Sequence, residues 1–195
     1  MDGDFPEPAS RSLRALDLLL LAPTLPFFAA LTSALALAVL LADGRPAFFS
    51  QPRVGRGRRP FRIWKLRTMT TEPEVSARRP TRLGAWLRQR GLDELPQLFN
   101  VLRGEMSLVG PRPLEPRDAE RLVAQHPPYA ARFAAQPGLT GLAQVCQARG
   151  VEHNARLDAA WAARASPAFA LKLLARTVWI NVVGKRRGAM PMPGA

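Results

Sequence analysis

The pattern of apolar and polar residues separates an apolar N-terminal segment from a mixed remainder. No charged residue occurs between Leu18 and Ala42, and an apolar helix needs about 20 residues to cross a bilayer. A domain of about 150 further residues could hardly enclose a helix that is apolar on every side. The pattern therefore predicts a membrane helix over residues 11–44. A polar, proline-containing lead-in at residues 1–10 is predicted to be disordered.

Prolines and arginines around this segment bear on its path through the bilayer. Pro23 and Pro26 each remove a backbone donor, which favours a kink or a re-entrant hairpin. Arg11 and Arg14 precede the apolar run, and five more arginines lie between residues 45 and 59. Because basic flanks stay in the cytoplasm, the part of the chain that follows the apolar run is expected to face the cytoplasm. Re-entrant and spanning paths both stay open at this stage.

The remainder, residues 45–183, is expected to form one catalytic domain followed by a basic flexible tail at 184–195. The fold class is α/β or mostly α, a small membrane-associated domain with a re-entrant N-terminal helix and amphipathic interface helices. Residues 61–66 mix apolar and basic side chains as a strand does, and 70–81 is a loop. Helices are predicted at 83–90, 96–103, 116–125 and in two stretches after residue 157 that meet at Ser166-Pro167.

Composition and charge limit the chemistry. The formal net charge of +13 indicates an anionic partner, which is nucleic acid, an acidic membrane surface or a phosphorylated substrate. Basic residues are nearly all arginine, so Lys65 suggests a need for a compact point charge. The single cysteine, Cys146, excludes an internal disulfide, and two histidines give little support to a zinc site. Any metal should be hard and bound by carboxylates.

The densest cluster of chemically capable residues runs from Gly91 to Pro113. Within it, Asp93 and Glu94 precede Pro96, which suits the first turn of a helix. The N-terminal end of a helix offers free amides and a positive dipole to a phosphate, and two adjacent carboxylates can share a divalent cation. The alternative is that Asp93 only caps the helix.

Two other motifs supply phosphate-binding candidates. In Gly110-Pro111-Arg112-Pro113 two prolines stiffen the backbone around one arginine, and a guanidinium held in this way suits bidentate recognition of phosphate. A pair with a structural carboxylate is the alternative for Arg112. Lys65 and Arg67 of FRIWKLRTM are further candidates, and for them the alternative is a solvated strand edge.

A resemblance to a known family is carried by QPRVGRGRRPFRIWKLRTM, GLDELPQLFNVLRGEMSLVGPRPL and QPGLTGLAQV. These runs closely resemble the bacterial sugar transferases that form the monotopic polyprenyl-phosphate phosphoglycosyl transferase family. The resemblance covers roughly residues 14–183, and it is to the smallest members, which lack extra domains. Some positions depart from the family pattern. Gly91 stands where serine is usual, and the prolines at 23 and 26 replace a Ser-Pro expected near Ala29-Ala30.

The resemblance implies a two-step enzyme of glycan or exopolysaccharide assembly at the cytoplasmic face of the bacterial inner membrane. Asp93 would be the nucleophile, Glu94 would complete the dyad, and Mg²⁺ would sit at this pair. Lys65, Arg88 and Arg112 would hold substrate phosphate. The aspartate would take a phospho-sugar from a UDP-sugar and release UMP, and undecaprenyl phosphate would then accept the phospho-sugar. The expected partners are these two substrates and membrane lipid, with homo-oligomerisation left open.

Two functions other than the transferase are also compatible with these features. One is a catalytically silent membrane scaffold of the same fold. The other is a membrane-tethered nucleic-acid binder, which the charge alone suggests. The sequence contains no recognisable nucleic-acid-binding motif, so we expect no nucleic-acid partner. The donor sugar and the length of the polyprenol cannot be read from the sequence.

Overall fold

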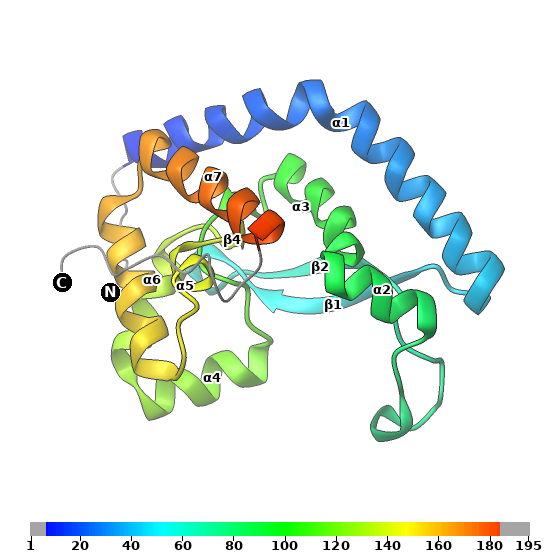
Figure 1. Cartoon of the computed structure of the whole chain (residues 1–195). Helices are drawn as coiled ribbons and strands as arrows, with labels where there is room; N and C mark the ends of the chain where they lie inside the picture. Colours follow the sequence, from blue (N-terminus) through cyan, green and yellow to red (C-terminus); the bar gives the residue numbers. More distant parts are fainter. Residues whose placement is uncertain (1–6, 184–195) are drawn as a thin grey trace.

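The computed structural model describes residues 7–183, which fold into helices around two small sheets (Figure 1). This confirms the predicted fold class, and the predicted tail at 184–195 lies outside the described residues. The helices are α1 (Glu7–Asp43), α2 (Arg82–Arg90), α3 (Leu98–Arg103), α4 (Pro116–Gln125), α5 (Leu142–Val145), α6 (Val151–Arg164) and α7 (Pro167–Val183). The strands are β1 (Phe48–Val54), β2 (Pro60–Leu66), β3 (Ser107–Val109) and β4 (Gly138–Thr140). Short 3-10 helices lie at Arg56–Arg58, Val75–Ala77, Leu92–Gln97 and Pro127–Ala134.

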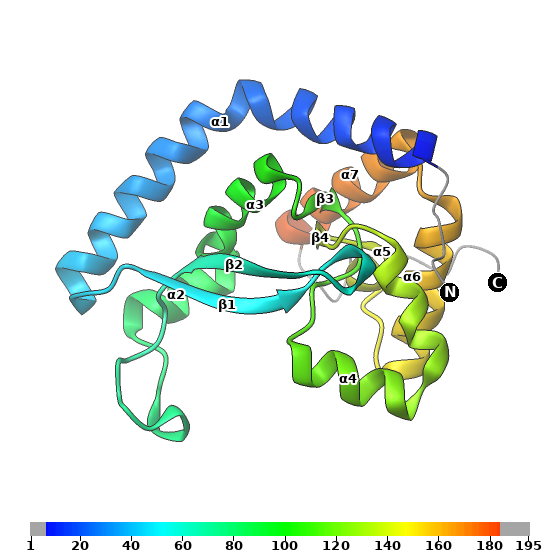
Figure 2. The ribbon, with the colours of Figure 1, turned by 180° about the vertical axis from the view of Figure 1, so that it is seen from behind.

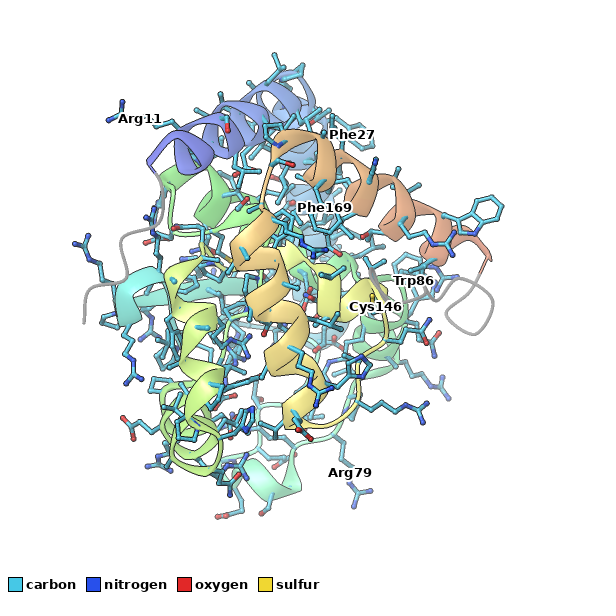
Figure 3. The ribbon with its side chains drawn as sticks, turned by 90° about the vertical axis from the view of Figure 1, so that its left-hand side faces the viewer. Arg11, Phe27, Arg79, Trp86, Cys146 and Phe169 are labelled. Atoms are coloured by element: carbon cyan, nitrogen blue, oxygen red, sulfur yellow. The ribbon has the colours of Figure 1, made fainter. Side chains whose placement is uncertain are left out.

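Helix α1 forms an arch over the domain and bends near its middle (Figure 1). Pro23 and Pro26 lie inside the helix, and each removes a backbone hydrogen bond, which accounts for the bend. The stretch Arg11–Asp43 is long and apolar enough to cross a membrane, and only 17% of its most apolar window is buried. Phe27, for example, is 66% exposed (Figure 3). A core helix of a soluble protein would be mostly buried, so the exposed apolar surface favours contact with lipid.

The start of α1 differs from the prediction. The helix begins at Glu7, so residues 7–10 of the predicted disordered lead-in are helical, and residues 1–6 lie outside the described part of the chain. Alanine and leucine dominate the residues that follow. Strong helix formers of this kind extend a helix toward its N-terminus once it is nucleated. The end at Asp43 agrees with the predicted boundary at residue 44.

Both ends of α1 are attached to the same domain. Near the N-terminal end, the Arg14 guanidinium donates to the carbonyl oxygen of Leu102 at 2.6 Å, at the end of α3. At the other end, Arg67 donates to the carbonyl oxygen of Asp43 at 2.6 Å. The Thr81 hydroxyl donates to the Asp43 carboxylate at 2.8 Å. Both ends of the helix are therefore fixed to the same domain.

The first sheet is an antiparallel hairpin of β1 and β2 that lies beneath the α1 arch (Figure 2). Strand β2 confirms the strand predicted at 61–66, whereas the sequence analysis predicts no strand at the residues of β1. Asn100 of α3 is fully buried and attaches this helix to β2, since its side-chain amide donates to the carbonyl oxygen of Arg62 at 2.7 Å. This contact sets α3, and the segment before it, against the hairpin.

The second sheet pairs β3 and β4 in parallel, with Ser107 opposite Gly138 and Val109 opposite Thr140. It packs under α5, α6 and α7 around the buried side chain of Trp161. Gly110, directly after β3, comes so close to the backbone of Gln136 that an added Cβ would lie 2.1 Å from its carbonyl oxygen. Only glycine fits there. The sheet therefore fixes the start of the Gly110–Pro113 loop.

Candidate active site

The two carboxylates of the predicted dyad lie in the 3-10 helix Leu92–Gln97, which connects α2 to α3. Gly91 ends α2 in the left-handed conformation, with φ of 68°, where glycine has no steric cost. Asp93 and Glu94 then occupy the first turn of the next helix, which begins at Leu92, four residues before the start predicted at Pro96. The cap residue of this helix is Gly91, without a side-chain cap. The structure therefore does not support the alternative that Asp93 only caps the helix.

Glu94 is the carboxylate that is held by cations. Its Oε1 atom lies 2.7 Å from Lys65 Nζ and 3.3 Å from Arg112 Nη2. Burial alone would raise the pKa of Glu94, but the positive charges of Lys65 and Arg112 outweigh burial and hold the pKa below its ordinary value. Glu94 therefore stays ionised and keeps both cations beside the dyad.

Asp93 has a different environment from its neighbour. It is 7% exposed, and within residues 7–183 no other side chain donates a hydrogen bond to its carboxylate. Burial, and then the charge of Glu94, raise the pKa of Asp93 above its ordinary value, while Lys65 opposes them. A desolvated carboxylate without a bound cation is a stronger nucleophile than a solvated one. In this pair, Glu94 is bound to two cations, whereas the Asp93 carboxylate has no side-chain hydrogen-bond donor within the described residues.

The Arg112 loop is held by its backbone. The carbonyl oxygen of Pro111 accepts from the amide of Gly138 at 2.9 Å, and the carbonyl oxygen of Arg112 accepts from the Arg132 guanidinium. The Arg112 side chain itself is 58% exposed. The backbone is therefore rigid, as the two flanking prolines predict, while the guanidinium is accessible from solvent.

Arg132 is itself fixed by a buried ion pair. Its Nη1 atom lies 3.3 Å from Asp158 Oδ2, and both side chains are 4% exposed. The guanidinium also lies over the ring of Tyr129, at 4.6 Å from its centroid. Burial raises the pKa of Asp158 to about 6, although the charge of Arg132 opposes it. A charged network inside the core thus holds the backbone that presents Arg112.

All five predicted site residues line one cavity of about 1010 Å³. Arg88, in the last turn of α2, faces this cavity and donates through Nε to the Thr68 hydroxyl at 2.7 Å. The structure thus brings Asp93 and Glu94 together with Lys65, Arg88 and Arg112, and their roles in a reaction stay predictions. Arg67 also lines the cavity, but its guanidinium is used to hold the end of α1.

Sequence reasoning missed Arg53 as a residue of this cavity. It counts among the arginines that flank the apolar segment, yet its side chain is only 16% exposed and donates to Gln51 at 2.7 Å. The hairpin register places Arg53 opposite Phe61 and Phe49 opposite Lys65. Cross-strand partners share a face of the sheet and alternate residues do too, so Arg53 and Lys65 lie on the same face. The pairing of the two strands was the missing signal.

The residues present fit a hard divalent cation. Within residues 7–183 there is no group of three or more histidine, cysteine or acidic residues that could hold a metal by itself. Mg²⁺ does not need such a group, because it commonly uses one or two carboxylates and completes its shell with water and substrate phosphate. Asp93 and Glu94 offer adjacent carboxylates on a cavity large enough for a diphosphate.

Comparison with known proteins agrees with this geometry. The family model for bacterial sugar transferases matches residues 9–184. A UDP-glucose:undecaprenyl-phosphate glucose-1-phosphate transferase from Caulobacter vibrioides is 49% identical over 145 residues, which are 70% of this chain and 54% of that protein. An undecaprenyl-phosphate glucose phosphotransferase from Komagataeibacter xylinus is 43% identical over 161 residues, 76% of this chain and 29% of that protein.

A third relative differs in the sugar that its name gives. It is a UDP-N-acetylgalactosamine-undecaprenyl-phosphate N-acetylgalactosaminephosphotransferase from Aeromonas hydrophila, 39% identical over 140 residues, 68% of this chain and 33% of that protein. The chain thus spans about half the length of the first of these relatives and about a third of the other two. Because the family model matches nearly every residue, the chain belongs to the bacterial sugar transferase family.

Proposed function

We propose that this chain transfers a phospho-sugar from a UDP-sugar to a polyprenyl phosphate, with undecaprenyl phosphate as the acceptor. One observation carries the proposal. A buried, uncommitted carboxylate, Asp93, opens onto the same cavity as Lys65, Arg88 and Arg112. Nucleophile and phosphate-binding cations are the two groups that such a transfer requires. The names of the relatives, which include UDP-sugars and undecaprenyl phosphate, support the same substrates.

The first step is attack by an Asp93 carboxylate oxygen on the sugar-linked phosphorus of the UDP-sugar. A bond forms between this oxygen and phosphorus, the bond from phosphorus to the bridging oxygen breaks, and UMP leaves with the bridging oxygen. In the second step, an oxygen of polyprenyl phosphate attacks the same phosphorus and releases Asp93. The product is a polyprenyl diphosphate sugar, and no oxidant or reductant is needed.

The cations change partners during this reaction. Lys65 and Arg112 are bound to Glu94 in the structure, and the negative charge of a diphosphate competes for both of them. Glu94 therefore keeps the cations in position until the donor arrives. When bound, Mg²⁺ would be held by Asp93 and Glu94, and it would neutralise charge on the diphosphate.

We also propose that α1 enters and leaves the membrane on the cytoplasmic side. Arg14 and Asp43, near opposite ends of the helix, both bind the catalytic domain. Helix α1 is long enough to cross a bilayer of about 30 Å. If it did cross, its two ends would lie on opposite sides of the bilayer and could not both bind the same domain. The bend at the two prolines gives the helix its return path.

The test is a screen for UMP release. Purified protein with Mg²⁺ and undecaprenyl phosphate is incubated with a panel of UDP-sugars, with Asp93→Asn as the control. We expect UMP from at least one donor with the wild type and none with the variant. Absence of UMP for every donor, from folded protein, would favour the catalytically silent scaffold.

A further inference from the structure

One wall of the cavity has no part in the reaction described above. It is formed by the end of β4, by α5 and by α7, through Thr140, Gln144 and Thr177. The two threonines are satisfied, because their hydroxyl oxygens lie 2.7 Å apart and Thr177 also donates to the carbonyl oxygen of Leu173 at 2.8 Å. Gln144 differs from them.

Both polar atoms of the Gln144 side chain are buried, and neither has a hydrogen-bond partner in the described part of the chain. Leaving such a group unpaired is costly, and a whole amide without partners calls for an explanation. Two other cavity residues, Arg53 and Arg67, also contain a buried nitrogen without a partner, but their guanidinium groups make other bonds. Gln144 makes none. In this conformation its Oε1 atom lies beside Gly141, and a turn of the side chain would present the amide to the cavity that the residue lines.

The backbone places Gln144 beside the phosphate-binding loop. The amide of Gly110 donates to the carbonyl oxygen of Thr140 at 2.8 Å. Gly141 then packs so closely that an added Cβ would lie 2.1 Å from the Gly110 carbonyl oxygen and 2.8 Å from Gln144 Oε1. Glycine at 141 thus makes room for the amide. The loop that presents Arg112 and the helix that carries Gln144 are joined at this point.

An amide side chain requires a ligand that donates and accepts at adjacent positions. Its NH₂ group donates and its oxygen accepts in one plane, which is the basis of bidentate base recognition by glutamine. The edge of uracil presents N3–H next to a ring carbonyl, so one ring would satisfy both polar atoms of Gln144 at once when the amide turns toward the cavity. Sugar hydroxyls also donate and accept, but they lack this planar edge.

We propose that Gln144 binds the uracil ring of the donor nucleotide, with Nε2 donating to a ring carbonyl and Oε1 accepting from N3–H. This assignment rests on the proposed function, because it takes the donor to be a uridine nucleotide. It places the base at α5 and the diphosphate between Arg112 and the dyad. Gln144 then acts in donor recognition and not in bond cleavage.

The experiment measures binding of UMP to the purified full chain by calorimetry, for the wild type and Gln144→Met. Methionine keeps the length of the side chain and removes both hydrogen bonds. Gln125→Met, on the exposed end of α4, is the matched control. We expect the Gln144 variant to bind UMP at least about tenfold more weakly, from the loss of two neutral hydrogen bonds, and the control to match the wild type.

Two further probes separate base recognition from other roles. Inorganic pyrophosphate lacks a base, so it should bind the wild type and Gln144→Met equally. N3-methyl-UMP lacks the N3 donor, so it should bind the wild type more weakly than UMP and should discriminate little between the two proteins. Parallel loss of UMP and pyrophosphate binding, with a lower Tm, would mean that Gln144 is structural and would overturn the proposal.

The remaining outcomes distinguish this proposal from the proposed function. Equal UMP binding by both proteins, with a raised KM for UDP-sugar in the variant, would assign Gln144 to the sugar and overturn base recognition. Failure of the wild type to bind UMP at all would contradict the proposed function itself.

Discussion

Replacement of Arg112 by alanine tests the phosphate-binding loop most selectively. Arg117 supplies the matched control, since it is an exposed arginine on α4, only five positions along the chain. The backbone around Arg112 is held by main-chain contacts that alanine retains, through the carbonyl oxygens of Pro111 and Arg112. The substitution should therefore remove the guanidinium and leave the loop in place.

The expected magnitude follows from two different contacts. In the resting protein, the Arg112–Glu94 pair joins a side chain that is 58% exposed to one that is 26% exposed, and an exposed pair of this kind contributes at most about 1 kcal/mol to stability. In the transition state the guanidinium would meet developing negative charge on phosphate, and losing such a contact costs about 2 to 4 kcal/mol. We therefore expect activity to fall tens- to hundreds-fold with little change in Tm.

The assay is kcat/KM for UMP release, with Tm measured on the same preparations. Arg112→Ala should lose most of the activity, Arg112→Lys should retain part of it because the charge stays while the planar fork is lost, and Arg117→Ala should match the wild type. Equal and small effects of the two alanine substitutions would remove Arg112 from the site.

Three further predictions follow from the charges and the membrane helix. Because the pKa of Asp93 is raised and a protonated carboxyl cannot attack, kcat/KM should fall as the pH is lowered through that pKa. Lys65→Met should move this acidic limb of the kcat/KM–pH profile to higher pH, since Lys65 lowers the pKa of Asp93. A limb at the same pH in both proteins would contradict this. Asp158→Asn leaves a buried guanidinium without its counter-charge and should cost about 3 to 5 kcal/mol in denaturant unfolding, whereas a loss below about 1 kcal/mol would argue against the buried pair. A cysteine at Ser10 in a Cys146→Ser background should be labelled only from the cytoplasm; labelling from the periplasm would mean a spanning helix.

Elements with local signals could be predicted from the sequence. The ends of α2 and α3 follow from Gly91 and Gly104, both of which adopt the left-handed conformation. The start of α4 follows from Pro116 in its first turn. The carboxylates were likewise found through their position before Pro96. In each case, two or three neighbouring residues determine the backbone.

Features that depend on distant contacts were not predicted. Strands β3 and β4 are three residues each and pair in parallel although they are distant in the sequence. Neither is long enough to show an alternation of apolar and polar residues. Arg132 and Asp158 look like ordinary residues of two helices until folding buries them together. Gln144 becomes notable only because its amide is buried without a partner. These features depend on contacts between residues that are distant in the sequence, and a local sequence pattern does not predict such contacts.

The most direct test of the central claim is the intact mass of the protein after incubation with UDP-sugar and Mg²⁺ in the absence of lipid. The account predicts an added phospho-sugar on the wild type, located by peptide mapping to the helix that contains Asp93. EDTA should prevent the adduct, and Asp93→Asn should not form it. Glu94→Gln should form it slowly, because this variant keeps the attacking oxygen of Asp93. If UMP appears only when polyprenyl phosphate is present, and rapid quenching traps no adduct, transfer is direct and Asp93 is not the nucleophile.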